Sequence, residues 1–169
     1  MFGDLTRSRI IAQSAAFIAL ITLGSWVSVP FFPVPLTLQT LFVLLAGAVM
    51  RRYSVIPVSV YIVLGALGLP VFHNGIAGFG ILLGPTGGYL IGFIPAVLIT
   101  GLAYEATTAR VHVIGLAVAT LIIYICGISW LLYSTGMGIT AALAMGMVPF
   151  LLGDVVKASA SFLIAQRLP

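Results

Sequence analysis

Long apolar runs, rather than alternating apolar and polar positions, dominate this chain. A membrane β-strand alternates lipid-facing and lumen-facing residues, whereas a membrane helix is a continuous apolar stretch of roughly 20 residues. Backbone groups in hydrocarbon also need internal hydrogen-bond partners, which a helix supplies. The pattern predicts an all-α membrane protein, a single integral membrane domain over residues 1–169. Its six transmembrane helices are expected at about residues 10–29, 36–50, 53–68, 86–104, 111–133 and 140–167.

Two of these helices depart from a simple span. Residues 36–50 rise only about 22 Å, less than the roughly 30 Å of the apolar slab. The proline-rich segment before them, residues 30–35, must therefore reach into membrane depth, against protein or a cavity. In the last helix, Pro149 is expected to introduce a kink.

Composition agrees with a membrane protein and limits what else the chain can be. The chain is 62% hydrophobic and 6% charged, with a mean hydropathy of +1.27, whereas a soluble domain carries roughly 25% charged residues. A single cysteine, Cys126, excludes an internal disulfide. The length leaves no room for a nucleotide-binding or catalytic domain, and the basic residues form no patch for nucleic acid.

The arginines predict the orientation in the membrane. They all fall at the termini or in the second and fourth loops of the six-helix arrangement: Arg7, Arg9, Arg51, Arg52, Arg110 and Arg167. The other loops carry no lysine or arginine. Since cytoplasmic loops are enriched in these residues, both termini are expected in the cytoplasm. The proline-rich segment, the glycine-rich segment 69–85 and the turn at Gly136 are then expected to face outward.

The most informative polar residues are Asp154 and Lys157, which lie inside the last apolar run. Their i,i+3 spacing puts them on one helix face. Two interpretations stay open. They can form a mutually neutralised pair inside the bundle, although two leucines would be less costly. Alternatively, they mark a ligand or ion path, which is the usual role of ionisable residues in membranes.

Three further segments are candidates for function. The segment "GPTGGY" enters a helix at Thr86, Gly87 and Gly88, where free backbone N–H groups can bind an anion or carboxylate, or where the glycines serve only close packing. Next to it, His73 and Asn74 add polar groups without metal-ligand spacing. In "VPLTLQTL", Thr40 is expected to bond to its own backbone, whereas Gln39 is costly to bury without a partner.

In the first helix, two small-xxx-small pairs stand out: Ala12 with Ala16, and Ala15 with Ala19. Such pairs serve internal packing or form a docking face for another membrane subunit. No nucleophile arrangement and no metal-binding motif occurs, so the chain is predicted not to be an enzyme and to need no cofactor.

Together, the motifs "PVPLTLQTLFVLLAG", "GLPVFHNG", "LLGPTGGYLIGF" and "GDVVK" resemble the biotin-binding S component (BioY) family of energy-coupling factor (ECF) transporters, over about residues 15–167. The resemblance implies a six-helix subunit of a prokaryotic cell membrane that binds biotin from outside. It also implies docking on a transmembrane coupling protein driven by two cytoplasmic ATPase subunits. The family's motifs fall on Asp154 with Lys157, on Thr86 to Tyr89, on Gln39, and on Ala15 with Ala19.

Biotin's chemistry suggests roles for these residues. A buried Asp154 can accept a ureido N–H, Lys157 can donate to the ureido carbonyl, and Asn74 can complete the ring contacts. Thr86, Gly87 and Gly88 with Gln39 can hold the carboxylate, while Phe72 and Tyr89 cover the bicycle. Two alternatives stay open: an S component for a different small vitamin, and a proton-coupled carrier in which Asp154 titrates.

Overall fold

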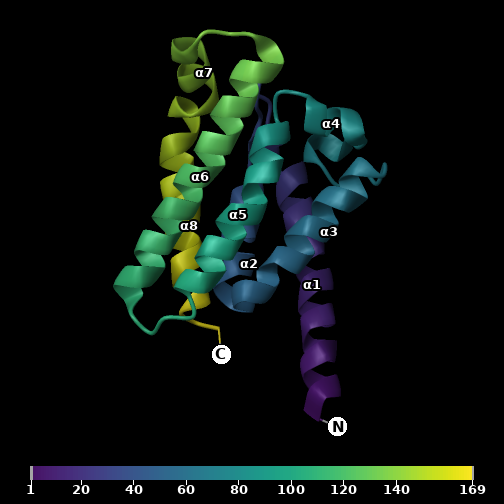
Figure 1. The fold of residues 1–169 in the computed structure, drawn as a ribbon, viewed down its shortest axis with the longest axis vertical. Helices are drawn as coiled ribbons and strands as arrows, with labels where there is room; N and C mark the ends of the chain where they lie inside the picture. Colours follow the sequence, from purple (N-terminus) through teal and green to yellow (C-terminus); the bar gives the residue numbers. More distant parts are fainter. Residues whose placement is uncertain (1, 169) are drawn as a thin grey trace.

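A computed structural model describes residues 2–168 of the chain, with side chains from Thr6 onward. It is a helical bundle (Figure 1). The α-helices are α1 (Phe2–Trp26), α2 (Gln39–Met50), α3 (Val55–Ala66), α4 (Phe79–Leu83), α5 (Gly87–Ala103), α6 (Ala109–Thr135), α7 (Ile139–Gly146) and α8 (Leu151–Ala165). Short 3-10 turns occur at η1 (Arg51–Ser54), η2 (His73–Gly75) and η3 (Val148–Phe150), and two short strands are β1 (Ser28–Val29) and β2 (Leu36–Thr37).

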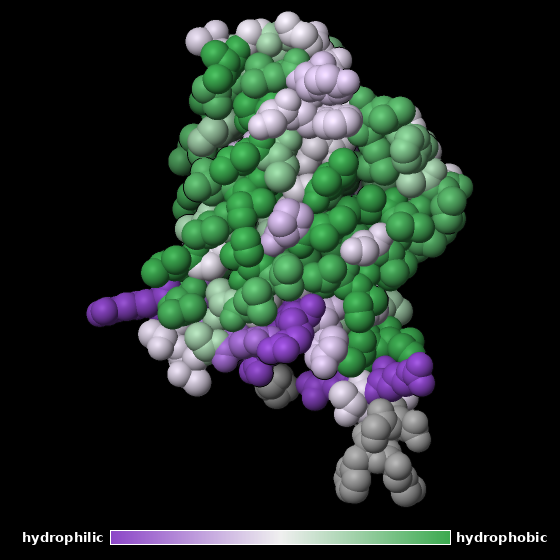
Figure 2. All heavy atoms as spheres, in the orientation of Figure 1, coloured by the Kyte–Doolittle hydropathy of each residue, from purple (hydrophilic) through white to green (hydrophobic). Residues whose placement is uncertain are grey.

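Within the described residues, four helical segments are long and apolar enough to cross a membrane. They are 6–26, 39–66, 109–135 and 139–165, and α5 is a shorter apolar helix. Helices α2 and α5 lie at the centre of the bundle: α5 packs against α2, α3 and α6, and α2 packs against α1 and α8. The outer surface is hydrophobic over most of its height, and the charged side chains gather at the lower end (Figure 2).

The segment 39–66 is not straight, because the chain turns sharply at Arg51. This residue has φ 54° and ψ −137°, which ends α2 after 12 residues. The Ser54 hydroxyl donates to the Arg51 carbonyl at 2.5 Å. Gly101 permits the close approach of α5, since a Cβ there would lie 2.3 Å from the Arg51 carbonyl oxygen. Helices α2 and α3 therefore point in different directions (Figure 1).

The proline-rich segment forms a β-hairpin, which the all-α prediction missed. Ser28 pairs with Thr37 and Val29 with Leu36 in antiparallel register. Prolines cannot donate to a ladder, so the paired stretch stays very short. The expectation that this segment lies against a cavity fits its position, because Val34 and Pro35 line one.

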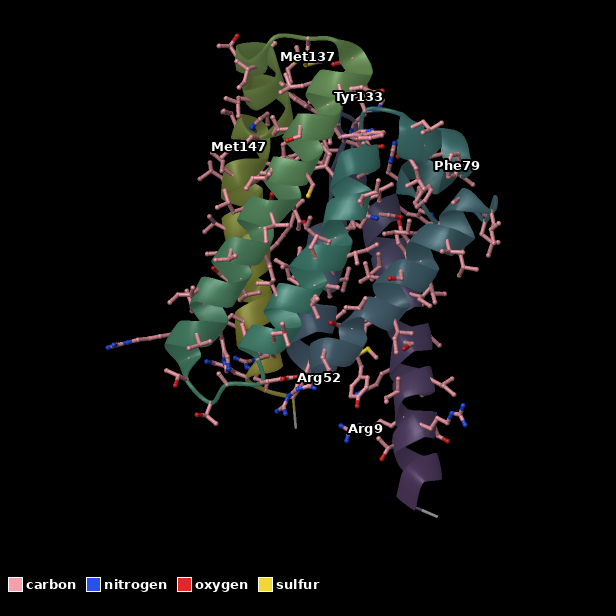
Figure 3. All side chains as sticks on the ribbon, in the orientation of Figure 1. Arg9, Arg52, Phe79, Tyr133, Met137 and Met147 are labelled. Carbon is pink, nitrogen blue, oxygen red and sulfur yellow. The ribbon has the colours of Figure 1, made fainter. Side chains whose placement is uncertain are left out.

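Other bounds differ from the predicted ranges. Helix α1 begins at Phe2 rather than near residue 10, since no proline interrupts the chain before Pro30. The segment 69–85, expected as a loop, contains α4. The predicted helix 140–167 is broken rather than only kinked: Met147 leaves helical geometry at φ −131° and ψ −56°, and Pro149 sits in the 3-10 turn that follows. Figure 3 labels Met147 at this break.

The break determines where Asp154 lies in its helix. Because α8 starts anew at Leu151, Asp154 falls in the first turn. Backbone N–H groups in a first turn have no partner within the helix, and the helix dipole there favours negative charge. A carboxylate is therefore better tolerated at this point than it would be in the middle of a continuous helix.

Candidate ligand-binding site

Asp154 and Lys157 form a buried ion pair. The Lys157 Nζ lies 2.9 Å from Asp154 Oδ1, and the side chains are only 11% and 10% exposed. Two more groups donate to the same carboxylate: the Tyr124 hydroxyl to Oδ2 at 2.5 Å, and the Thr40 hydroxyl to Oδ1 at 3.3 Å. Donors from α2, α6 and α8 thus converge on Asp154, as a buried charge requires.

The ion pair lies on the wall of a small cavity of about 60 Å³. The cavity is bounded by the proline-rich hairpin, the start of α2, η2, the start of α5, the middle of α6, η3 and α8. Its polar lining residues are Thr37, Gln39, Thr40, His73, Thr86, Tyr89, Tyr124, Asp154 and Lys157; Val34, Pro35, Leu90, Phe93, Ile123 and Phe150 complete the wall. Polar groups that converge on one cavity beside apolar side chains fit a site for a small polar molecule.

Five of the residues predicted from sequence therefore share one cavity: Gln39, Thr86, Tyr89, Asp154 and Lys157. Gln39 donates its amide N–H to the Tyr61 hydroxyl at 2.6 Å, which orients the amide. Tyr89 donates its hydroxyl to the Gly146 carbonyl at 2.7 Å, so it offers the cavity its ring rather than its hydroxyl.

Gly87 and Gly88 do not line the cavity, and the structure favours the packing role for both. A Cβ on Gly87 would lie 1.8 Å from the Leu82 carbonyl oxygen, and a Cβ on Gly88 would lie 2.2 Å from the Trp130 Cβ. The Gly87 backbone N–H already donates to the Gly84 carbonyl at 3.0 Å. These glycines let α5 approach α4 and α6 closely, which leaves Thr86 as the residue of this motif on the cavity wall.

Phe72 and Asn74 also lie off the cavity wall. Phe72 is fully buried against Tyr61, with ring centroids 5.7 Å apart, and its ring fills the space left by Gly65. It therefore serves the core in this conformation rather than covering a ligand. Asn74, at φ 56°, accepts a hydrogen bond from the Ser28 hydroxyl at 2.5 Å. Its amide ties η2 to the proline-rich hairpin.

His73 lines the cavity in place of Asn74. Burial lowers the pKa of the His73 imidazole below its ordinary value, so the ring is neutral at pH 7. A neutral imidazole offers one N–H donor and one nitrogen acceptor. It suits a polar ligand, and no group of residues able to hold a metal ion occurs in the part of the chain that the structure describes.

Sequence reasoning missed Tyr124 and misjudged Thr40. Thr40 was expected to bond to its own backbone, but its hydroxyl donates to Asp154. Tyr124 stands in the apolar run "LIIYICG", where a tyrosine hydroxyl in hydrocarbon needs a partner. That requirement could have identified Tyr124 as a residue with a polar partner. Nothing in the spacing of α6 and α8 along the chain shows that the partner is Asp154, 30 residues away.

All four alanines of α1 are exposed: Ala12, Ala15, Ala16 and Ala19. The buried side of the same helix carries Ser14, Phe17 and Ile21. Internal packing within this chain therefore does not account for the alanine pairs. They form a smooth face on the outside of the bundle.

The fold and the cavity together define a helical integral membrane protein with a small, partly open polar cavity between its helices. Comparison with known proteins narrows this class. The BioY family model matches residues 3–169, and the chain belongs to the BioY family. The resemblance inferred from the sequence motifs is thus confirmed.

Several relatives cover nearly the whole chain. The biotin transporter BioY of Thermotoga maritima is 41% identical over 162 residues, which span 95% of this chain and 95% of the relative. The probable biotin transporter BioY of Pyrococcus horikoshii is 39% identical over 163 residues, with 96% and 97% coverage. These relatives are transporters, and this chain is not an enzyme.

The fold matches a solved structure as well. The crystal structure of the S-component for biotin from an ECF-type ABC transporter superimposes with a TM-score of 0.87 at 26% identity. The match covers 97% of this chain and 92% of that chain. The helical architecture is therefore that of an ECF S-component.

A first prediction concerns Tyr124. The Tyr124→Phe variant loses the hydroxyl that orients Asp154, so ligand affinity should fall about tenfold, the usual effect of a hydrogen bond to a charged group. Equilibrium binding to the purified variant measures this. Tyr133→Phe is the matched control, since this tyrosine of the same helix is 82% exposed and should change nothing. Unchanged affinity in Tyr124→Phe would mean that the Tyr124 hydroxyl does not contribute to ligand binding.

Proposed function

We propose that this chain is the biotin-binding membrane subunit of an ECF-type vitamin uptake system. The observation that carries the proposal is the buried Asp154–Lys157 pair on the wall of a cavity between the helices, in a member of the BioY family. The names of the relatives and of the matching structure agree with biotin as the ligand.

The polar groups of the cavity complement a ureido ring. Lys157 has three N–H donors and spends one on Asp154, so it can donate to the ureido carbonyl. The Asp154 carboxylate has about four acceptor positions for its three donors, which leaves room for a ureido N–H. The rings of Tyr89, Phe93 and Phe150 offer apolar contact to the bicycle, and Thr86 with Gln39 can bind the carboxylate tail.

Ligand entry requires the cavity to enlarge. Small-molecule sites usually measure roughly 300–1,000 Å³, whereas this cavity measures about 60 Å³. The proline-rich hairpin and the η2 turn are among the wall segments that lie outside long helices. They are tied together by the Ser28–Asn74 hydrogen bond, so we expect them to move as one unit when biotin enters.

The proposed topology has six spans with both termini in the cytoplasm. The turn at Arg51 supports counting α2 and α3 as separate spans, and α5 supplies another apolar helix. Helices α7 and α8 together make the last span. The two ends of the ribbon lie at the same end of the bundle, where the labelled Arg9 and Arg52 also lie (Figures 1 and 3). By the positive-inside rule this end is cytoplasmic, so the cavity opens toward the outside.

Energy for uptake is proposed to come from partner subunits. The sequence carries no nucleotide-binding motif, and the exposed alanine face of α1 offers a smooth surface to a second membrane protein. The proposed partners are a transmembrane coupling protein and two cytoplasmic ATPase subunits in a prokaryotic cell membrane.

Equilibrium binding of labelled biotin to the detergent-purified chain tests the function. We expect saturable binding that excess desthiobiotin displaces and thiamine does not. Displacement by thiamine, riboflavin or niacin instead would assign a different vitamin. A folded sample that binds none of them, but carries proton-driven flux when reconstituted alone in vesicles, would replace the proposal with a carrier.

A further inference from the structure

A second hollow, of about 640 Å³, lies at the arginine end of the bundle, opposite the ligand cavity. Its walls come from α1, the α2–η1 junction, the α5–α6 loop and the C-terminal end of α8. The polar residues that line it are Arg9, Gln13, Arg51, Tyr104, Glu105, Thr107, His112 and Gln166. Neither the ligand cavity nor the alanine face uses any of these residues.

Tyr104 is the first sign that this hollow receives a ligand. The residue is only 8% exposed, and among the described residues its buried hydroxyl has no hydrogen-bond partner. Its ring is fixed by stacking on His112, with ring centroids 4.1 Å apart and planes 8° from parallel. His112 is itself held by a 2.8 Å contact between Nε2 and the Ala106 carbonyl. A buried hydroxyl without a partner is costly, so its retention at the wall of a hollow favours an acceptor that the described side chains do not supply.

The charge balance of the hollow indicates that the acceptor is an anion. Glu105 is the only carboxylate on its wall. Arg52 holds Glu105 through two bonds of 2.6 Å, and this contact lowers the pKa of the Glu105 carboxyl. In residues 6–168, where side chains are described, neither Arg9 nor Arg51 forms an ion pair. Glu105 is held by Arg52 and also feels the charge of Arg51, so this one carboxylate does not balance the arginines around the hollow, and the buried Tyr104 hydroxyl lies in the same wall.

The position of the hollow identifies the kind of anion. Arg9, which lines the hollow, lies at the lower end of the bundle (Figure 3), where the hydrophobic surface of the face drawn in Figure 2 gives way to charged side chains. This boundary is expected at the depth of lipid headgroups. Part of the hollow's wall is apolar, formed by Ala48, Val49, Ala165 and Leu168. Basic pockets between membrane helices at this depth suit anionic headgroups, and guanidinium groups bind phosphate oxygens through paired N–H donors.

We propose that this hollow binds the phosphate of an anionic phospholipid. Arg9 and Arg51 pair with the phosphate, the Tyr104 hydroxyl donates to one of its oxygens, and the amides of Gln13 and Gln166 are placed to contact the headgroup. The lipid then joins α1 to the α2–η1 junction and to α8, and so fixes the end of α1 that extends beyond the rest of the bundle (Figure 1). This proposal does not depend on the identity of the transported vitamin.

Native mass spectrometry of the full chain in neutral detergent, titrated with lipid, tests the proposal. Phosphatidylglycerol is expected to bind at least tenfold more tightly than phosphatidylcholine. The double variant Arg9→Gln/Arg51→Gln should lose about tenfold or more of that affinity, since two charge-assisted contacts disappear. Arg110→Gln is the matched control. It removes one positive charge from the same end but lies outside the hollow, and should change affinity less than twofold.

Tyr104→Phe makes the test specific and remains available if the double variant does not fold. Without lipid, removing a buried unpaired hydroxyl should leave the thermal unfolding midpoint unchanged or raise it. With phosphatidylglycerol, affinity should fall roughly three- to tenfold. A merely structural tyrosine would show the opposite pattern, with lower stability and unchanged lipid affinity.

Three outcomes would overturn the proposal. Equal losses in Arg110→Gln and in the double variant would mean diffuse attraction rather than a site. Inorganic phosphate binding as tightly as phosphatidylglycerol would mean a site for a free anion. Unchanged lipid binding in the double variant, together with loss of energised uptake, would assign the hollow to contact with a protein subunit.

Discussion

Replacing both members of the buried ion pair, as Asp154→Asn with Lys157→Met, should abolish biotin binding while the protein stays as stable as the parent or becomes more stable. The stability expectation follows from desolvation. A buried pair gains little over neutral residues of similar size, because taking two charges out of water costs about as much as their attraction returns. The affinity expectation follows from the donors and acceptors that the pair would present to the ureido ring. We expect at least a hundredfold loss.

The double variant is more informative than either single change. Lys157→Met alone leaves the Asp154 charge with only the Tyr124 and Thr40 hydroxyls, and loss of one partner from a buried pair typically costs about 3–5 kcal/mol of stability. Weak binding by that variant could then reflect poor folding. Thermal unfolding without biotin, followed by equilibrium binding, separates the two effects. If the double variant bound biotin as tightly as the parent, the pair would have a structural role and would not be part of the binding site.

Bulky residues on the alanine face, as Ala15→Trp with Ala19→Trp, should leave biotin binding intact and reduce energised uptake to background. Both alanines are exposed on α1, away from the cavity. Added indole rings therefore meet no neighbour within the chain, but they prevent close approach of a partner helix. Uptake by cells or vesicles holding the complete transporter measures the loss, and binding to the isolated subunit measures what is retained.

Leu121→Trp is the matched control for this pair. Leu121 is 52% exposed on α6, so the substitution places one indole ring on a different outer face. Uptake should stay near the parental level. Normal uptake by the alanine variants would exclude this face from docking, and loss of biotin binding in them would mean that α1 supports the cavity after all.

The sequence identified candidate site residues where charged or polar side chains stand inside apolar runs. Asp154 and Lys157 stand out because ionisable residues are rare in an apolar run, and the structure buries both on one cavity wall. Gln39 was identified in the same way. The long apolar runs likewise predicted helices, and their approximate positions follow from hydropathy alone.

Other features depend on contacts between segments distant in the chain. From the sequence, Gly88 fits both an anion-binding N–H and a packing position; the packing role becomes visible only in the structure, where a Cβ on Gly88 would lie 2.2 Å from the Trp130 Cβ. From the sequence, the Phe72 ring is a candidate for ligand contact; in the structure it packs into the space beside Gly65. His73 and Asn74 are neighbours in sequence, but the left-handed φ of Asn74 directs them differently, and only His73 reaches the cavity wall.

The restart of the last helix at Leu151 places Asp154 in a first turn, where the protein itself can solvate the carboxylate. A carboxylate within a membrane has lost its hydration shell, and here the chain itself replaces that shell: two hydroxyls, an ammonium group and the open first turn of α8 surround Asp154. Unlike water, these groups are held in position by three different helices. The cavity therefore offers a fixed pattern of donors and acceptors, and a molecule with a different pattern would have to leave some of its own polar groups unpaired.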